Sequence, residues 1–291
     1  MERFEAYKNK IEAYLLDLQK QMTDGAGYYK ELADSMCYSL KAGGKRIRPV
    51  MLLAACEMAG GDIEKALPFA AAMEMIHTSS LIHDDLPAMD DDDLRRGKPT
   101  NHKVYGEATA ILAGDAMLLY PFELMAKSVT DIKQVRAIAI IAQNAGLNGM
   151  CGGQMIDLYY EGKKTNEDII TQLNCLKTGA LFKASICAGI ALAGGSDAEI
   201  KAGEIYGDKI GMAFQLVDDL LDNDPNAQTG KTKGSDIASD KSTYLSVYGA
   251  EKCKALIKSC TEEAERVLTE TFGEKASFLV SLARQMETRN S

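Results

Sequence analysis

The sequence lacks the features that mark several protein classes. Its seven cysteines include no CxxC pair, and most lie in apolar periodic segments where a free cysteine behaves as a small hydrophobe. We therefore expect reduced, non-catalytic thiols. Positive charge is scarce, with 33 Lys and Arg against 42 Asp and Glu and a net charge of −9. General binding to nucleic acid or anionic membrane needs excess positive charge, so we expect neither partner.

Long apolar runs are also missing. The stretch ATAILAGDAMLLYPFELMA is interrupted by Asp115 and Glu123, so we expect no membrane-spanning helix. The first twenty residues are charged throughout and lack the apolar core of a signal peptide. We therefore expect a cytoplasmic protein.

Helical periodicity is what the sequence has in abundance. Apolar side chains recur at three- and four-residue intervals from Phe4 to Leu18, as on an amphipathic helix. Similar patterns occur at residues 28–41, 50–59, 64–85, 107–128, 131–148, 166–193, 197–222, 244–271 and 274–288. No convincing run of alternating β-branched residues is present, so the predicted fold class is all-α. Short breaks and the absence of a long linker predict a single domain over residues 1–291.

Two clusters of aspartates lie against apolar helical segments. The first includes Asp84, Asp85 and Asp90 in LIHDDLPAMDDDDLRRGKPTNH, and the second includes Asp218, Asp219 and Asp222 in FQLVDDLLDND. Asp218 and Asp222 share a helix face, where like charges destabilise each other unless a cation binds. Pro87 predicts the end of the first helix, which would let Asp90 approach Asp84. His77 shares a face with Asp84, about 10 Å away.

Carboxylate ligands without cysteine or clustered histidine suit Mg²⁺ or Ca²⁺ rather than zinc. An EF-hand begun at Asp222 fails, because Ala227 and Lys233 stand where glycine and glutamate are required. A phosphate loop before Lys231 also fails, because Pro225 replaces its first glycine.

Cations accompany the acidic clusters. In GGKRIRP, Lys45, Arg46 and Arg48 follow a glycine turn at a helix start, a place suited to phosphate. Arg95 and Arg96 follow the first acidic cluster, and adjacent side chains are placed to serve two different anions. Further cations are Lys177, Lys231 and Lys241. The combination predicts one cavity in which Mg²⁺ bridges carboxylates to a diphosphate, beside a basic pocket for a second diphosphate.

These motifs resemble those of the trans-prenyl diphosphate synthases, in particular the short-chain bacterial farnesyl and geranylgeranyl diphosphate synthases. The motifs GGKRIRP, IHDDLPAMDDDDLRRGKPTNH, GGQMID, LKTGALF, FQLVDDLLD, GKTKGSD and DKSTY occur in the family's order. The resemblance implies a polyprenyl synthetase domain with antiparallel helices around a deep central cavity, usually homodimeric. It also implies a Mg²⁺-dependent condensation of isopentenyl diphosphate with an allylic diphosphate, either dimethylallyl or geranyl diphosphate.

The resemblance further implies roles for individual residues. The residues similar to magnesium ligands are Asp84, Asp85, Asp90, Asp218 and Asp222. Those similar to the residues around the allylic substrate are Arg95, Lys177, Thr178, Gln215, Lys231 and Lys241. Those similar to the isopentenyl diphosphate pocket are Lys45, Arg48, His77 and Arg96. The implied catalytic set is Asp84, Asp90, Arg95, Lys177, Thr178, Gln215 and Asp218.

Product length depends on the residues that close the hydrophobic tunnel below Asp84. Many farnesyl-producing relatives have an aromatic residue five positions before the first aspartate, where this sequence has Ser79, followed by Ser80. A small residue leaves room for another isoprene unit, unless Met75 or Ile76, or the segment from Leu112 to Met117, closes the tunnel. We therefore expect farnesyl diphosphate, with extension to geranylgeranyl diphosphate.

Two other functions remain open at this point. A class I terpene cyclase could share the fold and an aspartate-rich helix, but it would not need a second, metal-free diphosphate pocket. A non-catalytic subunit of a heteromeric prenyl synthase is the other alternative. Loss of an aspartate motif would favour it, and both motifs are intact.

Overall fold

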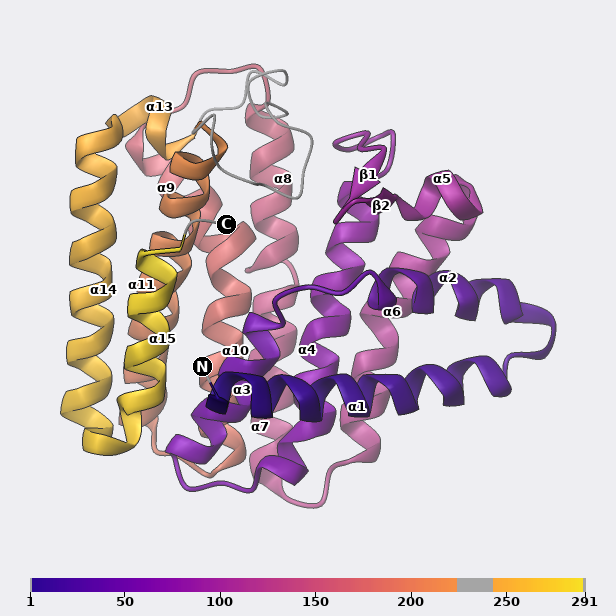
Figure 1. The fold of residues 1–291 in the computed structure, drawn as a ribbon, viewed down its shortest axis with the longest axis horizontal. Helices are drawn as coiled ribbons and strands as arrows, with labels where there is room; N and C mark the ends of the chain where they lie inside the picture. The colour runs from indigo at the N-terminus through magenta and orange to yellow at the C-terminus, as the bar shows by residue number, and fades with distance from the viewer. Residues whose placement is uncertain (1, 224–242, 290–291) are drawn as a thin grey trace.

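A computed structural model describes residues 2–223 and 243–289 (Figure 1). The helices are α1 (Glu2–Asp24), α2 (Lys30–Lys41), α3 (Ile47–Met58), α4 (Ile63–Asp84), α5 (Asn101–Tyr105), α6 (Glu107–Lys127), α7 (Ile132–Ala145), α8 (Met150–Tyr160), α9 (Glu167–Asn174), α10 (Ala180–Leu192), α11 (Asp197–Asp222), α13 (Tyr244–Tyr248), α14 (Ala250–Phe272) and α15 (Ser277–Glu287). A π-helical turn, Cys175–Gly179, joins α9 to α10. Two short 3-10 helices, η1 (Gly27–Tyr29) and η3 (Gly273–Ala276), and two short antiparallel strands, β1 (Leu94–Arg95) and β2 (Lys98–Pro99), complete the described part. The predicted all-α fold class is confirmed.

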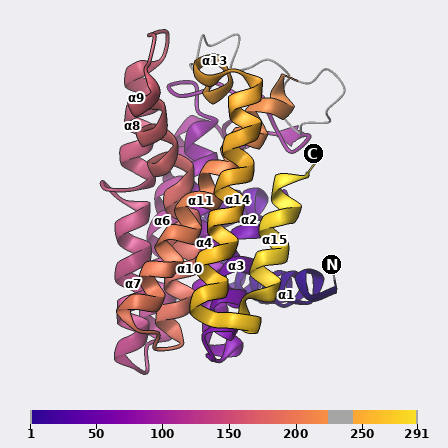
Figure 2. The same ribbon diagram turned by 90° about the vertical axis from the view of Figure 1, so that its left-hand side faces the viewer.

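The long helices form an upright bundle, across which α1 and α2 run (Figure 1). Helix α10 lies at its centre, in contact with α3, α4, α7 and α11. Eleven of its thirteen residues are buried, as expected for a helix that is apolar on all sides. Helices α14 and α15 pack along α11 on the outside (Figure 2).

Besides the short α5, helix α8 was not predicted from the sequence. The periodic segment 131–148 ends earlier than expected, at Ala145, and a separate helix α8 begins at Met150. Glycine is a poor helix former, and Gly149, Gly152 and Gly153 hide this helix from a periodicity argument. Helix α8 nevertheless forms a wall of the cavity described below.

Two described stretches are long and apolar enough to cross a membrane, judged by length and composition alone. In Glu167–Leu192, 67% of the apolar window is buried inside the protein. In Glu107–Lys127 only 33% is buried, because Ile111, Leu112 and Leu119 of α6 are exposed. Helix α6 therefore presents an apolar outer face.

Candidate active site

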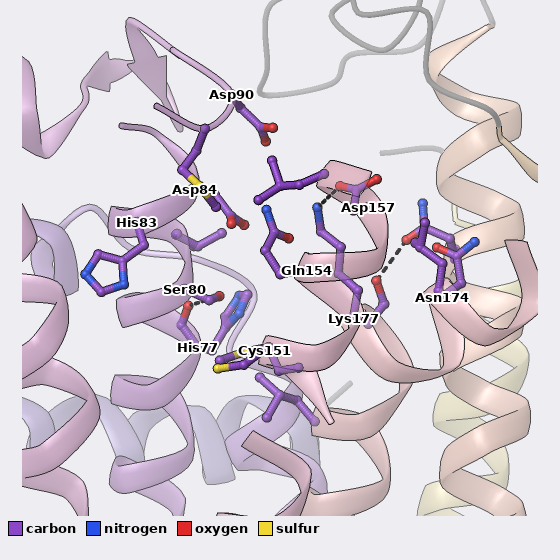
Figure 3. A pocket seen from close by; sticks show the side chains of 18 of the residues that line it. His77, Ser80, His83, Asp84, Asp90, Cys151, Gln154, Asp157, Asn174 and Lys177 are labelled. Carbon is purple, nitrogen blue, oxygen red and sulfur yellow. Dashed lines mark hydrogen bonds and ion pairs between the residues drawn. The ribbon is translucent and has the colours of Figure 1, made fainter. Parts of the chain in front are cut away.

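The end of α4 carries the first aspartate cluster into a cavity. The helix ends at Asp84, and the backbone N–H of Asp90 donates a hydrogen bond to the Asp84 carbonyl oxygen over 2.9 Å. The predicted approach of Asp90 to Asp84 is confirmed. Both side chains line a cavity of about 540 Å³ (Figure 3). Burial raises the pKa of the Asp84 carboxyl group.

The second aspartate cluster reaches the same cavity from α11. Asp218, Asp219 and Gln215 line it. The buried Asp219 carboxylate accepts hydrogen bonds from Gln215 Nε2 (2.9 Å) and from the backbone N–H of Tyr244 (2.7 Å), and so holds α13 against α11. Asp218 forms an ion pair with Arg289 near the C-terminus. Asp222 is not among the residues that line the cavity.

Helix α8 and the π-helical turn supply a further wall (Figure 3). Lys177 Nζ lies 2.5 Å from Asp157 Oδ2, and Thr178 Oγ1 donates a hydrogen bond to Gln215 Oε1 over 3.1 Å. Gln154 Nε2 is buried and has no hydrogen-bond partner among the described residues. Neither Gln154 nor Asp157 was predicted from the sequence to line the site. The signal was their place in GGQMID, where an amide and a carboxylate interrupt apolar residues.

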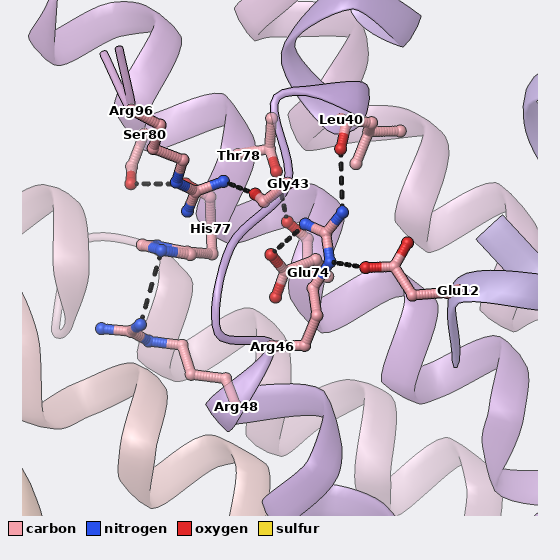
Figure 4. Close-up of polar contacts among 10 residues, drawn as sticks. All are labelled: Glu12, Leu40, Gly43, Arg46, Arg48, Glu74, His77, Thr78, Ser80 and Arg96. Atoms are coloured by element: carbon pink, nitrogen blue, oxygen red, sulfur yellow. Dashed lines mark hydrogen bonds and ion pairs between the residues drawn. The ribbon is translucent and has the colours of Figure 1, made fainter. Parts of the chain in front are cut away.

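The predicted basic pocket is partly assembled in the cavity. Arg48 and His77 both line it, with Arg48 Nη1 3.4 Å from His77 Nε2 (Figure 4). The Arg48 guanidinium lies over the Phe182 ring, 4.6 Å from its centroid. Burial lowers the pKa of Arg48 to about 10, and Arg48 Nε has no hydrogen-bond partner among the described residues. Burial, reinforced by the positive charge of Arg48, lowers the pKa of His77 well below its ordinary value.

Lys45 and Arg96 lie off the lining of this cavity. Arg96 donates a hydrogen bond to the carbonyl oxygen of Gly43, and its guanidinium carbon lies 2.8 Å from where a Cβ atom on Gly44 would stand (Figure 4). Glycine at position 44, with φ of 142°, therefore leaves room for Arg96. Lys45, the next residue, is exposed, and the remaining burial lowers its pKa.

Arg46, which lies between Lys45 and Arg48 in the sequence, is turned into the protein. Its guanidinium bonds to Glu74 Oε1 (2.7 Å), to Glu12 Oε1 (2.7 Å) and to the Leu40 carbonyl oxygen (2.8 Å) (Figure 4). The Arg46 and Glu74 side chains are each only 2% exposed. This buried pair fixes the turn that precedes Arg48.

Arg95 and Asp85 form a hydrogen-bonded ion pair. Arg95 Nε donates to Asp85 Oδ1 over 2.8 Å, and Arg95 Nη2 also pairs with Asp92 at 3.0 Å. Arg95 lines the cavity, whereas Asp85 does not. Burial raises the pKa of Asp85 to about 6. Lys231 and Lys241 lie outside the described residues.

The residues expected to close the tunnel below Ser79 do not line this cavity. Ser79 and Ser80 line the cavity, and Ser79 Oγ donates to the Ile76 carbonyl oxygen over 2.7 Å. Met75 and Ile76 are fully buried in the core and do not line it. On α6 the lining residue is Leu118, because the helix turns Leu112 to the surface and Met117 into the core. Helix α8 adds Met150 and Cys151.

The donors in the cavity suit a hard divalent cation. Within the described ranges, no group of three His, Cys, Asp or Glu side chains is close enough to hold a metal alone. Asp84 and Asp90 reach the cavity from one cluster and Asp218 from the other. Mg²⁺ is commonly bound by one or two carboxylates together with waters and substrate phosphates, so this all-oxygen set fits it.

Residues 29–278 match the family model of the polyprenyl synthetases. The chain belongs to the polyprenyl synthetase family. It is 46% identical to a geranylgeranyl diphosphate synthase of Cyanophora paradoxa, over 89% of this chain and 87% of that protein. It is 45% identical to a dimethylallyltranstransferase of Fischerella ambigua, over 97% and 81% of the two chains.

Solved structures similar to this polyprenyl synthetase include an FPP/GFPP synthase from Zymomonas mobilis, with a TM-score of 0.84, 35% identity, and coverage of 98% of this chain and 100% of that one. A geranylgeranyl pyrophosphate synthetase from Geoglobus acetivorans gives a TM-score of 0.85, 28% identity and coverage of 97% and 99%. The family resemblance and the prenyltransferase activity expected from the sequence are thereby confirmed.

Proposed function

We propose that this polyprenyl synthetase condenses isopentenyl diphosphate with dimethylallyl and longer allylic diphosphates, and that geranylgeranyl diphosphate is its main product. The observation that carries the proposal is one cavity with carboxylates from both aspartate clusters and the small side chain of Ser79 in its lining. A small residue there leaves room for a chain longer than farnesyl. The names of the relatives from Cyanophora paradoxa and Geoglobus acetivorans support this product.

The proposed cofactor is Mg²⁺, held by Asp84, Asp90 and Asp218 together with the allylic diphosphate. When bound, the metal offsets the charge of the diphosphate and stabilises it as a leaving group. In this proposal Asp85 keeps Arg95 in place at the cavity wall, and Asp222 adds negative charge near Asp218.

The protein's own groups bind and orient the two substrates. Lys177 and Arg95 neutralise the allylic diphosphate, while the oxygen dipoles of Thr178 and Gln215 face the allylic cation that forms when it departs. Lys231 and Lys241 are proposed to assist from outside the described residues. The departing diphosphate is the proposed proton acceptor, since no protein nucleophile or general base is required.

Isopentenyl diphosphate is proposed to bind at Arg48 and His77, with Lys45 and Arg96 beside them. The buried guanidinium of Arg48, whose Nε has no hydrogen-bond partner among the described residues, offers a positive charge that a diphosphate would pair with. This pocket favours a synthase over a terpene cyclase, which has no use for a second diphosphate. Both intact aspartate motifs favour an active chain over a non-catalytic subunit.

The working unit is proposed to be a cytoplasmic homodimer of single-domain chains. The exposed apolar residues of α6 and α7, including Leu119 (68% exposed) and Ile132 (78% exposed), support pairing of two copies through this face. Sedimentation of the wild type and of Leu119→Asp tests this, with a dimer expected for the first and dissociation for the second.

Mass spectrometry of the products tests the function. The purified chain is incubated with isopentenyl and dimethylallyl diphosphates and Mg²⁺, and geranylgeranyl diphosphate is expected. Farnesyl diphosphate as the final product would overturn the chain-length proposal alone. Cyclic products without consumption of isopentenyl diphosphate would identify a cyclase. No turnover by the chain alone, with activity restored by a second protein, would identify a heteromeric subunit.

A further inference from the structure

Glycines on two different helices touch the backbone of the π-helical turn that carries Lys177 and Thr178. A Cβ atom at Gly153 of α8 would lie 2.1 Å from the backbone nitrogen of Lys177 and 2.6 Å from its Cα. A Cβ atom at Gly211 of α11 would lie 2.6 Å from the Cα of Gly179. All three glycines are buried. Any other residue at position 153 or 211 would force backbone to move.

Lys177 meets α8 at two points, one helical turn apart. Gly153 and Asp157 are four residues apart and therefore share a face of α8. The backbone of Lys177 rests against Gly153, while its ammonium group pairs with Asp157 at 2.5 Å. The close approach at Gly153 thus determines how far the Lys177 side chain extends along α8 into the cavity.

The turn itself is of a kind found at functional sites. A π-helical turn inserts an extra residue into a helix, is rare, and occurs frequently at functional sites. Here it directs Lys177 and Thr178 into the cavity, and Thr178 bonds to Gln215 of α11. Both side chains therefore depend on where two neighbouring helices hold the turn.

We propose that Gly153 is a positioning residue for the condensation reaction. It sets the place of Lys177 and Thr178 at the allylic diphosphate, and Gly211 supports the turn from α11. Gly153 touches no substrate and acts through Lys177. The inference rests on the proposed function, because it takes Lys177 and Thr178 to serve the allylic diphosphate. Relieving the contact at 2.1 Å needs a displacement of about 1 Å, enough to cost about 100-fold in rate.

Gly153→Ala tests the proposal, with Gly189→Ala as the matched control. Gly189 is also buried, and its Cβ would lie 2.4 Å from the Leu52 carbonyl oxygen, where α10 packs on α3. Neither Gly189 nor the residues that this Cβ would approach line the cavity. For Gly153→Ala, kcat/KM for the allylic diphosphate is expected to fall about 100-fold, with KM for isopentenyl diphosphate unchanged. Gly189→Ala is expected to lose thermal stability without this split. An equal effect in both variants would overturn the proposal.

A double-mutant cycle with Asp157→Asn separates positioning from general loosening. If Gly153 acts through Lys177 and its partner, the two losses are not additive, and the double variant is about as slow as the slower single one. Additive losses would contradict the proposal. Gly211→Ala, which brings only one backbone atom within 3 Å, replaces Gly153→Ala with the same expectations if that variant does not fold.

The outcomes distinguish this inference from the proposed function. If the wild type turns over and Gly153→Ala retains its allylic kcat/KM, only the inference fails. If the wild type shows no prenyl transfer, the proposed function fails, and calorimetric binding of inorganic diphosphate with Mg²⁺ then tests Gly153. Weaker binding by Gly153→Ala than by Gly189→Ala supports the positioning role, and equal binding overturns it.

Discussion

Arg289 Nη2 lies 2.5 Å from Asp218 Oδ1, so the end of the chain is paired with a proposed metal ligand 71 residues earlier. Arg289 Nη2 also donates to the Phe214 carbonyl oxygen over 2.9 Å, and its guanidinium stands over the Phe214 ring. A cation already at Asp218 competes with any metal that uses this carboxylate.

Arg289→Ala is therefore expected to strengthen Mg²⁺ binding while weakening the metal-free fold. Loss of the partly exposed ion pair should cost about 1 kcal/mol of unfolding free energy. The rise in melting temperature on adding Mg²⁺ and inorganic diphosphate should be larger than in the wild type. A smaller rise would show that Arg289 helps the bound state instead of competing with it.

Ser79→Tyr is expected to shorten the product. Ser79 is 2% exposed and lines the cavity, so a tyrosine ring there occupies the space into which the growing chain extends. Product mass spectrometry checks this, with Ser79→Ala as the control that keeps the side chain small. An unchanged product distribution in Ser79→Tyr would place the tunnel floor elsewhere.

Leu118→Ala is expected to lengthen the product, because it removes bulk from the α6 side of the cavity lining. Leu112→Ala is the control: the same change is made on the same helix, at a side chain that is 56% exposed and outside the cavity. Product analysis at equal conversion compares the two variants. If Leu112→Ala also lengthens the product, the effect comes from α6 as a whole.

The low pKa of His77 predicts a pH-dependent loss of stability. The folded protein keeps His77 neutral, whereas the unfolded chain binds a proton near the ordinary histidine pKa of 6.5. Below about pH 6.5 the unfolded state therefore binds more protons than the folded state. The free energy of unfolding decreases as the pH is lowered, by up to about 1.4 kcal/mol per pH unit. His77→Gln removes this term, so its stability relative to the wild type should rise between pH 7.5 and pH 5 in urea denaturation. A pH-independent difference would contradict it.

The buried ion pair of Arg46 and Glu74 predicts a contrast between two glutamates that bind the same arginine. Glu74→Ala leaves a buried guanidinium without its buried partner and should cost about 3–5 kcal/mol. Glu12 is 41% exposed, and Glu12→Ala should cost at most about 1 kcal/mol. Urea denaturation compares them, and equal losses would show that the Arg46 charge is compensated from elsewhere.

The charged residues of the site could be predicted from the sequence more completely than the helices that line its cavity. Asp84 and Asp218 were predicted to share a cavity from carboxylates crowded against apolar segments, and Arg48 from a basic helix start, and all three line one cavity. Helix α8 was missed, since its glycines serve close packing and so depress the local helical signal. The contact of Gly153 with Lys177 joins residues 24 positions apart through a turn that periodicity does not encode.

The orientation of individual side chains also could not be predicted from the sequence. Asp85 was expected to support the magnesium ligands and Arg95 to bind the allylic substrate, and the hydrogen bond between the two side chains was not predicted. Leu118 was overlooked by one position, because a helical rotation of about 100° per residue separates the surface from the cavity.

In both Asp-Asp pairs the second aspartate is more buried than the first. Asp85 and Asp219 are both 3% exposed and bonded to protein groups, Asp85 to Arg95 and Asp219 to Tyr244 and Gln215. The first member of each pair, Asp84 or Asp218, is less buried and lines the cavity. In each motif the more buried aspartate therefore supports the fold beside the proposed metal ligand, and the two adjacent aspartates cannot exchange places. Replacing the first tests chemistry, whereas replacing the second tests architecture.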